Sequence, residues 1–141
     1  MLSTSESFSF LPMICYEAIF PGLLPGDSER PSFLLNVTND AWFGRTPGPY
    51  QHFAQARMRA IETGLPLVRA ANTGLSAIID GKGEVIERLE IFEKGIIDGK
   101  LPLRIGKTIY ETFGDVPVLV AMFLLVAFAA IAQYNRGSRL D

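Results

Sequence analysis

Short apolar runs separated by turn-forming residues fill the first hundred positions of the chain. Residues 8–15 and 32–38 are apolar runs of strand length with polar neighbours, so they predict two buried strands. Residues 50–63 are mostly helix formers with apolar residues at helical spacing, and Gly64 marks the end of this predicted helix. Four further runs predict strands, at residues 65–71, 75–80, 84–92 and 93–103.

The connecting segments have turn chemistry. Residues 16–24 predict a short helix or helical turn, and residues 39–49 are so rich in Pro and Gly towards their end that they predict a long loop. Residues 80–83, with the sequence DGKG, predict a hairpin turn. Strand, helix, strand and helix followed by a run of strands predicts a layered α/β fold with a mixed sheet.

The end of the chain has a different composition. Residues 116–132 carry no charge, and a membrane-spanning helix needs roughly 17–25 mostly apolar residues. A core helix of a soluble protein seldom runs this long without a polar face. Tyr134 stands where an interfacial aromatic would, and Arg136 and Arg139 follow it. This predicts a transmembrane helix over 112–135, a cytoplasmic tail over 136–141, and residues 1–111 on the opposite side.

Composition excludes several classes of protein. The net charge of −2 argues against a nucleic-acid-binding protein, which would carry a basic stripe. One cysteine and one histidine are too few for a structural zinc site, which needs four nitrogen or sulfur ligands. The first ten residues lack the basic and apolar regions of a secretory signal.

Cys15 is the first candidate for chemistry. It ends an apolar run, and Tyr16 and Glu17 follow directly. Two interpretations stand side by side: a buried cysteine that acts as a small hydrophobe, or a nucleophile at a strand-to-helix turn. Such a turn would free the backbone N–H of Tyr16 or Glu17 to stabilise developing negative charge. The carboxylate of Glu17 disfavours a thiolate, so a nucleophile here would need a cation from elsewhere.

His52 is one candidate partner for Cys15, in a Cys–His dyad. It falls on the first turn of the predicted helix, and no Asn or Asp is evident in the sequence to orient it. The alternative is a histidine that only orients or hydrogen-bonds another group. The lysines in the second half of the chain lie in turns or at strand ends, and none is typical of a desolvated partner for Cys15.

The stretch NDAWFG, residues 39–44, is the second candidate. A loop after a buried strand is a common place for binding residues, and Trp42 and Phe43 would expose much aromatic area there. The alternative is that both rings simply cover the edge of the core.

Three linked stretches carry a resemblance. ICYEAIFPG, LLNVTNDAWFG and GPYQHFAQARMRAIETGLPLVRAANTGLSAIID occur in this order before the apolar tail. From about residue 12 to residue 132, the chain resembles the C-terminal part of bacterial apolipoprotein N-acyltransferases, which are membrane members of the nitrilase (carbon–nitrogen hydrolase) superfamily. The resemblance implies the C-terminal half of a nitrilase-like αββα sandwich, a partial domain over 1–111, followed by one transmembrane helix.

The resemblance also implies roles for single residues. Cys15 matches the nucleophile, Glu17 a supporting glutamate, and the N–H of Tyr16 an oxyanion-hole donor. Trp42 matches a tryptophan near the acyl site, and the substrate-binding set is Asn39, Trp42, Phe43 and His52. The family's base glutamate and lysine lie upstream of the cysteine strand, and nothing in this chain matches them, so we expect a truncated form that is inactive by itself.

The implied reaction moves a fatty acyl chain from a phospholipid to the N-terminal amine of an apolipoprotein through a cysteine thioester. It requires no cofactor, no metal and no nucleic acid. The expected location is the bacterial inner membrane, with the catalytic part on the periplasmic side. Two alternatives remain: a nitrilase-type amide hydrolase, and an inactive membrane-anchored binding module.

Overall fold

A computed structural model describes residues 9–22 and 30–137 of the chain. The chain divides into two compact units, Met1–Thr108 and Ile109–Asp141, which are described separately here. The beginning of the first predicted strand, most of the polar segment before the second strand, and the end of the predicted tail lie outside the described residues.

The first unit is built on one five-stranded sheet. The strands, in chain order and also in spatial order, are β1 Phe10–Ile14, β2 Phe33–Asn39, β3 Leu67–Asn72, β4 Ser76–Ile79 and β5 Val85–Leu89. β1, β2 and β3 run parallel, and the connection from β2 to β3 contains a helix, as parallel neighbours require. The short turns before β4 and β5 make those strands antiparallel. The predicted mixed sheet is therefore confirmed.

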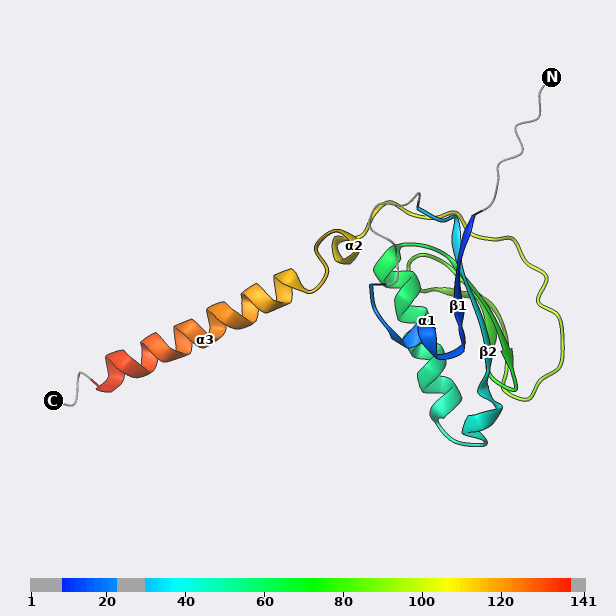
Figure 1. Cartoon of the computed structure of the whole chain (residues 1–141), viewed down its shortest axis with the longest axis horizontal. Helices are drawn as coiled ribbons and strands as arrows, with labels where there is room; N and C mark the ends of the chain where they lie inside the picture. The colour runs from blue at the N-terminus through cyan, green and yellow to red at the C-terminus, as the bar shows by residue number, and fades with distance from the viewer. Residues whose placement is uncertain (1–8, 23–29, 138–141) are drawn as a thin grey trace, which may run out of the picture. The chain divides into compact units, whose positions relative to one another are not determined.

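Helix α1, Gly48–Thr63, runs along one face of this sheet (Figure 1). Pro49 stands in its first turn, where a missing N–H costs nothing, and Gly64 ends it in the left-handed conformation at φ 64°. The buried side of the helix presents Phe53, Ala56 and Ala60 to the core. One helix layer on one sheet agrees with half of a four-layered sandwich, and the helix predicted at 50–63 is confirmed.

Side chains alternate along the strands, and their buried members form the core between the sheet and α1. On β2, Leu34 and Asn36 are buried, whereas Val37 is exposed. The core cluster consists of Met13, Ala18, Leu34, Phe53, Ala56, Ala60, Leu65, Leu67, Leu75, Ala77 and Ile79.

Two short 3₁₀ helices follow the first two strands. η1, Cys15–Ile19, agrees with the predicted helical turn. η2, Asp40–Phe43, lies inside the segment predicted to be a loop, so that prediction was wrong over these four residues. The Asn39 side chain accepts a hydrogen bond from the N–H of Ala41 at 3.1 Å, and this cap permits a turn of helix before the Pro- and Gly-rich part.

The strand predicted within residues 93–103 is wrong. All of these residues are described, and none of them pairs with the sheet. Gly95 and Gly99 weaken an extended strand, and Pro102 has no N–H to donate to a neighbouring strand. Ile96 and Leu103 consequently remain about nine-tenths exposed, at 92 % and 90 %.

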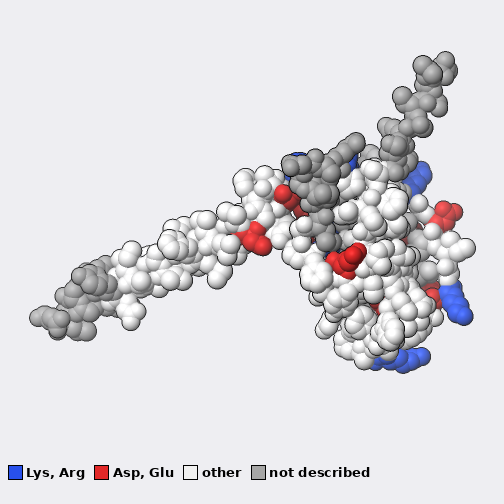
Figure 2. Space-filling model, viewed as in Figure 1, with Lys and Arg blue, Asp and Glu red and all other residues white. Residues whose placement is uncertain are grey.

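The second unit contains α2, Ile109–Phe113, and α3, Val116–Gly137. Within α3, Val116–Gln133 is long and apolar enough to cross a membrane, and none of it is buried. Residues 116–133 carry no charge, and Figure 2 shows this part of α3 without red or blue atoms. The apolar helix predicted from the charge-free tail is confirmed, and α2 was not predicted.

Candidate active site

Cys15 lies at a sharp turn of the backbone. β1 ends at Ile14, and Cys15 begins η1 with φ 53°, in the left-handed region that residues other than glycine rarely adopt. Its thiol is free and exposed, which excludes the interpretation as a buried small hydrophobe. A strained conformation at an exposed nucleophilic side chain is a pattern found at functional sites.

Glu17 holds this turn in place. Its Oε2 accepts a hydrogen bond from the N–H of Ile14 at 2.6 Å, directly before the cysteine. A carboxylate accepting from a backbone amide makes a strong, charge-assisted bond. The carboxylate that disfavours a thiolate by its charge therefore also fixes the backbone that presents the thiol.

A row of side chains crosses the buried face of the sheet next to this turn. The register of the parallel strands places Met13 beside Asn36, and Asn36 beside Arg69. Asn36 donates from Nδ2 to the carbonyl of Met13 at 2.7 Å and accepts from Arg69 at Oδ1. Arg69 also donates from Nε to the carbonyl of Leu75. Neighbouring strands thus hold a fully buried guanidinium in one fixed orientation.

Asp40 joins this arginine to the histidine of α1. Its Oδ2 lies 2.8 Å from a terminal nitrogen of Arg69, and its Oδ1 lies 2.8 Å from Nδ1 of His52. A carboxylate can only accept, so Nδ1 of His52 carries the proton and donates it to Asp40. We call Asp40, His52 and Arg69 the buried polar cluster.

Charge within the cluster is balanced by these contacts. Burial would raise the pKa of Asp40, but the hydrogen bond from His52 and the charge of Arg69 outweigh it, so this pKa lies below its ordinary value. Burial lowers the pKa of Arg69, against the opposing effects of Asp40 and Cys15. Cys15 is thus close enough to affect the pKa of this buried cation.

Thr38 connects the cluster to the thiol. Ile14, the last residue of β1, pairs with Val37, so the residues that follow them in the chain, Cys15 and Thr38, also come together. Oγ1 of Thr38 lies 3.7 Å from Sγ of Cys15 and 3.3 Å from Oδ1 of Asp40. The hydroxyl therefore lies between the exposed thiol and the buried carboxylate.

His52 makes no dyad with Cys15 here. Its Nδ1 is engaged by Asp40, and Nε2 has no hydrogen-bond partner among the residues that the structure describes. Its ring lies against those of Tyr16 and Phe43, with centroids 5.5 and 5.8 Å away. No acid to orient His52 was evident from the sequence, but the structure shows that Asp40 orients it.

The two aromatic residues of the NDAWFG segment have different surroundings. Trp42 is 87 % exposed, more than any other aromatic residue among those that the structure describes. Phe43 is half-buried between His52 and Gly48. A Cβ added at Gly48 would stand 2.5 Å from the Phe43 ring. Asn39 bonds inside the protein, since its Oδ1 also accepts from Asn72 at 3.0 Å. Phe43 therefore packs against His52, whereas Trp42 is exposed to solvent.

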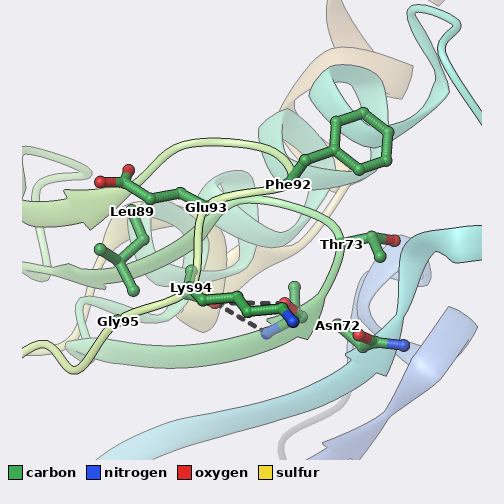
Figure 3. Close-up of a pocket in the computed structure, with 9 residues that line it drawn as sticks. Asn72, Thr73, Leu89, Phe92, Glu93, Lys94 and Gly95 are labelled. Carbon is green, nitrogen blue, oxygen red and sulfur yellow. Dashed lines mark hydrogen bonds between the residues drawn. The ribbon is translucent and has the colours of Figure 1, made fainter.

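A separate pocket of about 410 Å³ lies where β3, β4 and β5 meet the segment after β5. Its lining includes Asn72, Leu89, Phe92 and Lys94, and Figure 3 shows Lys94 extending towards Asn72. None of the predicted site residues lines this pocket. Among residues 9–22 and 30–137, no group of three His, Cys, Asp or Glu side chains could hold a metal ion.

Four residues of the site, Asn36, Thr38, Asp40 and Arg69, were not predicted from the sequence. A local signal existed for two of them, since Asn36 and Arg69 each interrupt an apolar strand with a polar side chain. A buried polar residue requires partners, so such interruptions predict a polar contact between neighbouring strands. Nothing local indicates that the contact lies beside Cys15.

Residues 4–110 match the carbon–nitrogen hydrolase family, so the chain is a member of this family. The similarity extends to individual proteins. The chain is 59 % identical over 121 residues to an apolipoprotein N-acyltransferase of Bradyrhizobium diazoefficiens, covering 84 % of this chain and 22 % of the relative.

Two other relatives of the same name cover nearly the whole chain. The Rhodopseudomonas palustris protein is 49 % identical over 91 % of this chain and 24 % of its own length. The Brucella melitensis protein is 46 % identical over 96 % of this chain and 26 % of its own length. The chain thus spans about a quarter of the length of these curated relatives.

Proposed function

We propose that this chain supplies the nucleophile of an enzyme that transfers a fatty acyl chain from a phospholipid to the N-terminal amine of an apolipoprotein. The observation that carries the proposal is the exposed Cys15 at a left-handed turn fixed by Glu17. The names of the relatives and the match to the carbon–nitrogen hydrolase family support it.

The reaction proceeds in two displacements. The Cys15 thiolate attacks the carbonyl carbon of the phospholipid ester, a C–S bond forms, and the C–O bond to glycerol breaks. The lysophospholipid leaves as an alcohol after it takes up a proton. The acceptor amine then attacks the thioester carbonyl carbon, a C–N bond forms, and the C–S bond breaks. The amine loses its proton to a base or to solvent, and Cys15 returns as the thiolate.

The remaining site residues have separate roles in this proposal. The N–H of Tyr16 stabilises the oxyanion of each tetrahedral intermediate. Trp42, exposed on η2, contacts the acyl chain, while Phe43 and His52 form the wall behind it and Asn39 holds the η2 turn. The base glutamate and the lysine that the resemblance implies match no residue of this chain.

The proposed location is the bacterial inner membrane, which the α3 segment Val116–Gln133 would cross. Arg136 and Arg139 after this segment favour a cytoplasmic C-terminus, so the first unit would be periplasmic. A reporter fused after Asp141 should be active only when its activity requires the cytoplasm. Activity of a periplasm-dependent reporter would contradict this orientation.

The test of acyl transfer uses a chimera in which this chain replaces the matching region of the Bradyrhizobium relative. After incubation with a phospholipid that carries an isotope-labelled acyl chain, mass spectrometry should find the labelled acyl group on Cys15. Cys15→Ser is the control, because the hydroxyl is a much weaker nucleophile. The 141-residue chain is tested in parallel, where we expect no adduct.

Two other outcomes would contradict the proposal. Hydrolysis of small amides without any phospholipid adduct would favour the amide hydrolase. A folded chimera with neither reaction would favour a binding module without chemistry. An adduct on the 141-residue chain would instead contradict the expectation that this chain is inactive by itself. It would show that its own residues, with His52 the first candidate, suffice to activate the thiol.

A further inference from the structure

The environment of Cys15 contains a hydroxyl that the proposed reaction does not yet use. Thr38 stands at the end of β2, half-buried, on the same side of the strand as Leu34 and Asn36. Its Oγ1 lies 3.7 Å from Sγ of Cys15, within the range of a hydrogen bond to sulfur, and 3.3 Å from Oδ1 of Asp40. This hydroxyl contacts both the exposed thiol and the buried polar cluster.

A hydroxyl has one proton to donate and two lone pairs that accept. When Cys15 is a thiol, its S–H can donate to Oγ1 while the Thr38 proton points to Asp40. When Cys15 is a thiolate, the sulfur becomes a stronger hydrogen-bond acceptor and competes with Asp40 for the Thr38 hydroxyl. Asp40 can lose the hydrogen bond from Thr38, because its Oδ1 still accepts a hydrogen bond from His52 and its Oδ2 one from Arg69.

The charged groups around the thiol make such a donor useful. Glu17 of η1 and Asp40 of η2 are negative, and Arg69 of β3 is positive; His52 of α1 faces Asp40. The carboxylate of Glu17 disfavours a thiolate through its charge, and the charge of Arg69 is paired with Asp40. A hydrogen bond given directly to the sulfur adds stabilisation that this charge arrangement does not provide.

We propose that Thr38 is a positioning residue for Cys15: its hydroxyl turns from Asp40 to Sγ when the thiol loses its proton, and so favours the thiolate. This inference rests on the proposed role of Cys15 as the nucleophile. Thr38 itself contacts no reacting atom other than the sulfur, and the proton lost by the thiol goes to solvent or to the base.

The test exploits the single cysteine of the chain, since alkylation of the whole molecule then reports Cys15 alone. The full chain in detergent is treated with iodoacetamide between pH 6 and 10, and the modified fraction is followed by mass spectrometry. Thr38→Val keeps the shape and removes the hydroxyl. Thr38→Ser keeps the hydroxyl and removes the methyl group.

We expect Thr38→Val to slow alkylation at pH 7 by about three- to tenfold and to move the midpoint of the pH profile upwards. This three- to tenfold range lies below the full effect of a hydrogen bond to a charged group, because Cys15 is exposed to water. Thr38→Ser should keep the profile of the unsubstituted chain. The same pair is made in the chimera with the Bradyrhizobium relative, where alkylation of the peptide that contains Cys15 is measured.

The proposal fails if the profiles of the Val variant and the unsubstituted protein coincide, or if the Ser variant changes as much as the Val variant. Alkylation requires no phospholipid, so its outcome is separate from that of acyl transfer. A shifted profile without any acyl adduct in the chimera would overturn the proposed reaction and leave the role of Thr38 standing. An adduct with an unshifted profile would do the reverse.

Discussion

Replacing Asp40 with asparagine should destabilise the first unit strongly. Asp40 is fully buried, and its carboxylate accepts from both His52 and Arg69. An asparagine has nearly the same shape but no charge, and its Nδ2 would place a donor where the carboxylate accepts from Arg69 or from His52. The guanidinium would keep its contacts with Asn36 and Leu75 but lose its only counter-charge in the cluster.

The magnitude follows from the burial of the pair. Breaking a buried ion pair by removing one partner costs roughly 3–5 kcal/mol, because an uncompensated charge stays in the interior. The matched control is Glu90→Gln, since Glu90 pairs with Arg88 at 2.6 Å but both side chains are about half exposed. An exposed pair of this kind contributes about 0–1 kcal/mol. The two neutralising substitutions should therefore differ several-fold in cost.

Hydrogen exchange of the β2 and β3 peptides in the detergent-solubilised chain measures the difference, because these strands contain Asn36 and Arg69. Asp40→Asn should lower their opening free energy by about 3 kcal/mol or more, and Glu90→Gln by less than about 1 kcal/mol. Combining Asp40→Asn with Arg69→Met should cost less than the sum of the single changes. Equal effects of Asp40→Asn and Glu90→Gln would refute the reasoning.

Three shorter predictions follow from the same region. Trp42→Ala should change the unfolding free energy by no more than about 0.5 kcal/mol while it lowers phospholipid turnover in the chimera, and a loss of about 3–5 kcal/mol would instead indicate a core tryptophan. Gly74→Ala should lower the melting temperature, because its Cβ would stand 2.1 Å from Oδ2 of Asp40, whereas Gly106→Ala, with open space around it, should not. The pKa of Asp40 is lowered on folding, so its stabilising contribution is complete above the ordinary aspartate value of 3.8 and is lost as the pH falls below that value; acid unfolding of Asp40→Asn should lack this part, and an unchanged acid transition would contradict the assignment.

The sheet could be predicted from the sequence because its strands are local signals. Apolar runs of strand length identified β1 and β2, and their alternation with helical segments before the later strands predicted a layered fold with a mixed sheet. The false strand at 93–103 arose from the same reasoning, since its apolar residues are real. Without a neighbouring strand to pair with, two glycines and a proline prevail over the apolar pattern.

The candidate site divides in the same way. Cys15 and Glu17 are neighbours in sequence, so their relation was visible before the structure. Asp40 and Arg69 lie 29 residues apart and meet only because η2 turns back over the parallel register of β2 and β3. A shift of that register by one residue would place Arg69 on the other face of the sheet. Local patterns contain no information on such a register.

The structure changes what the cation near Cys15 must be. From the sequence, a catalytic Cys15 needs a positive charge to offset Glu17. Arg69 is a buried positive charge, and Cys15 is close enough to affect its pKa. Yet Asp40 lies 2.8 Å from its guanidinium, so the pair presents little net charge to the sulfur. What the cluster offers is orientation: an ionised carboxylate held from two sides, next to a hydroxyl that can turn towards the thiolate. We therefore expect activation of Cys15 to depend on both the Thr38 hydroxyl and a further cation, the lysine that the resemblance implies.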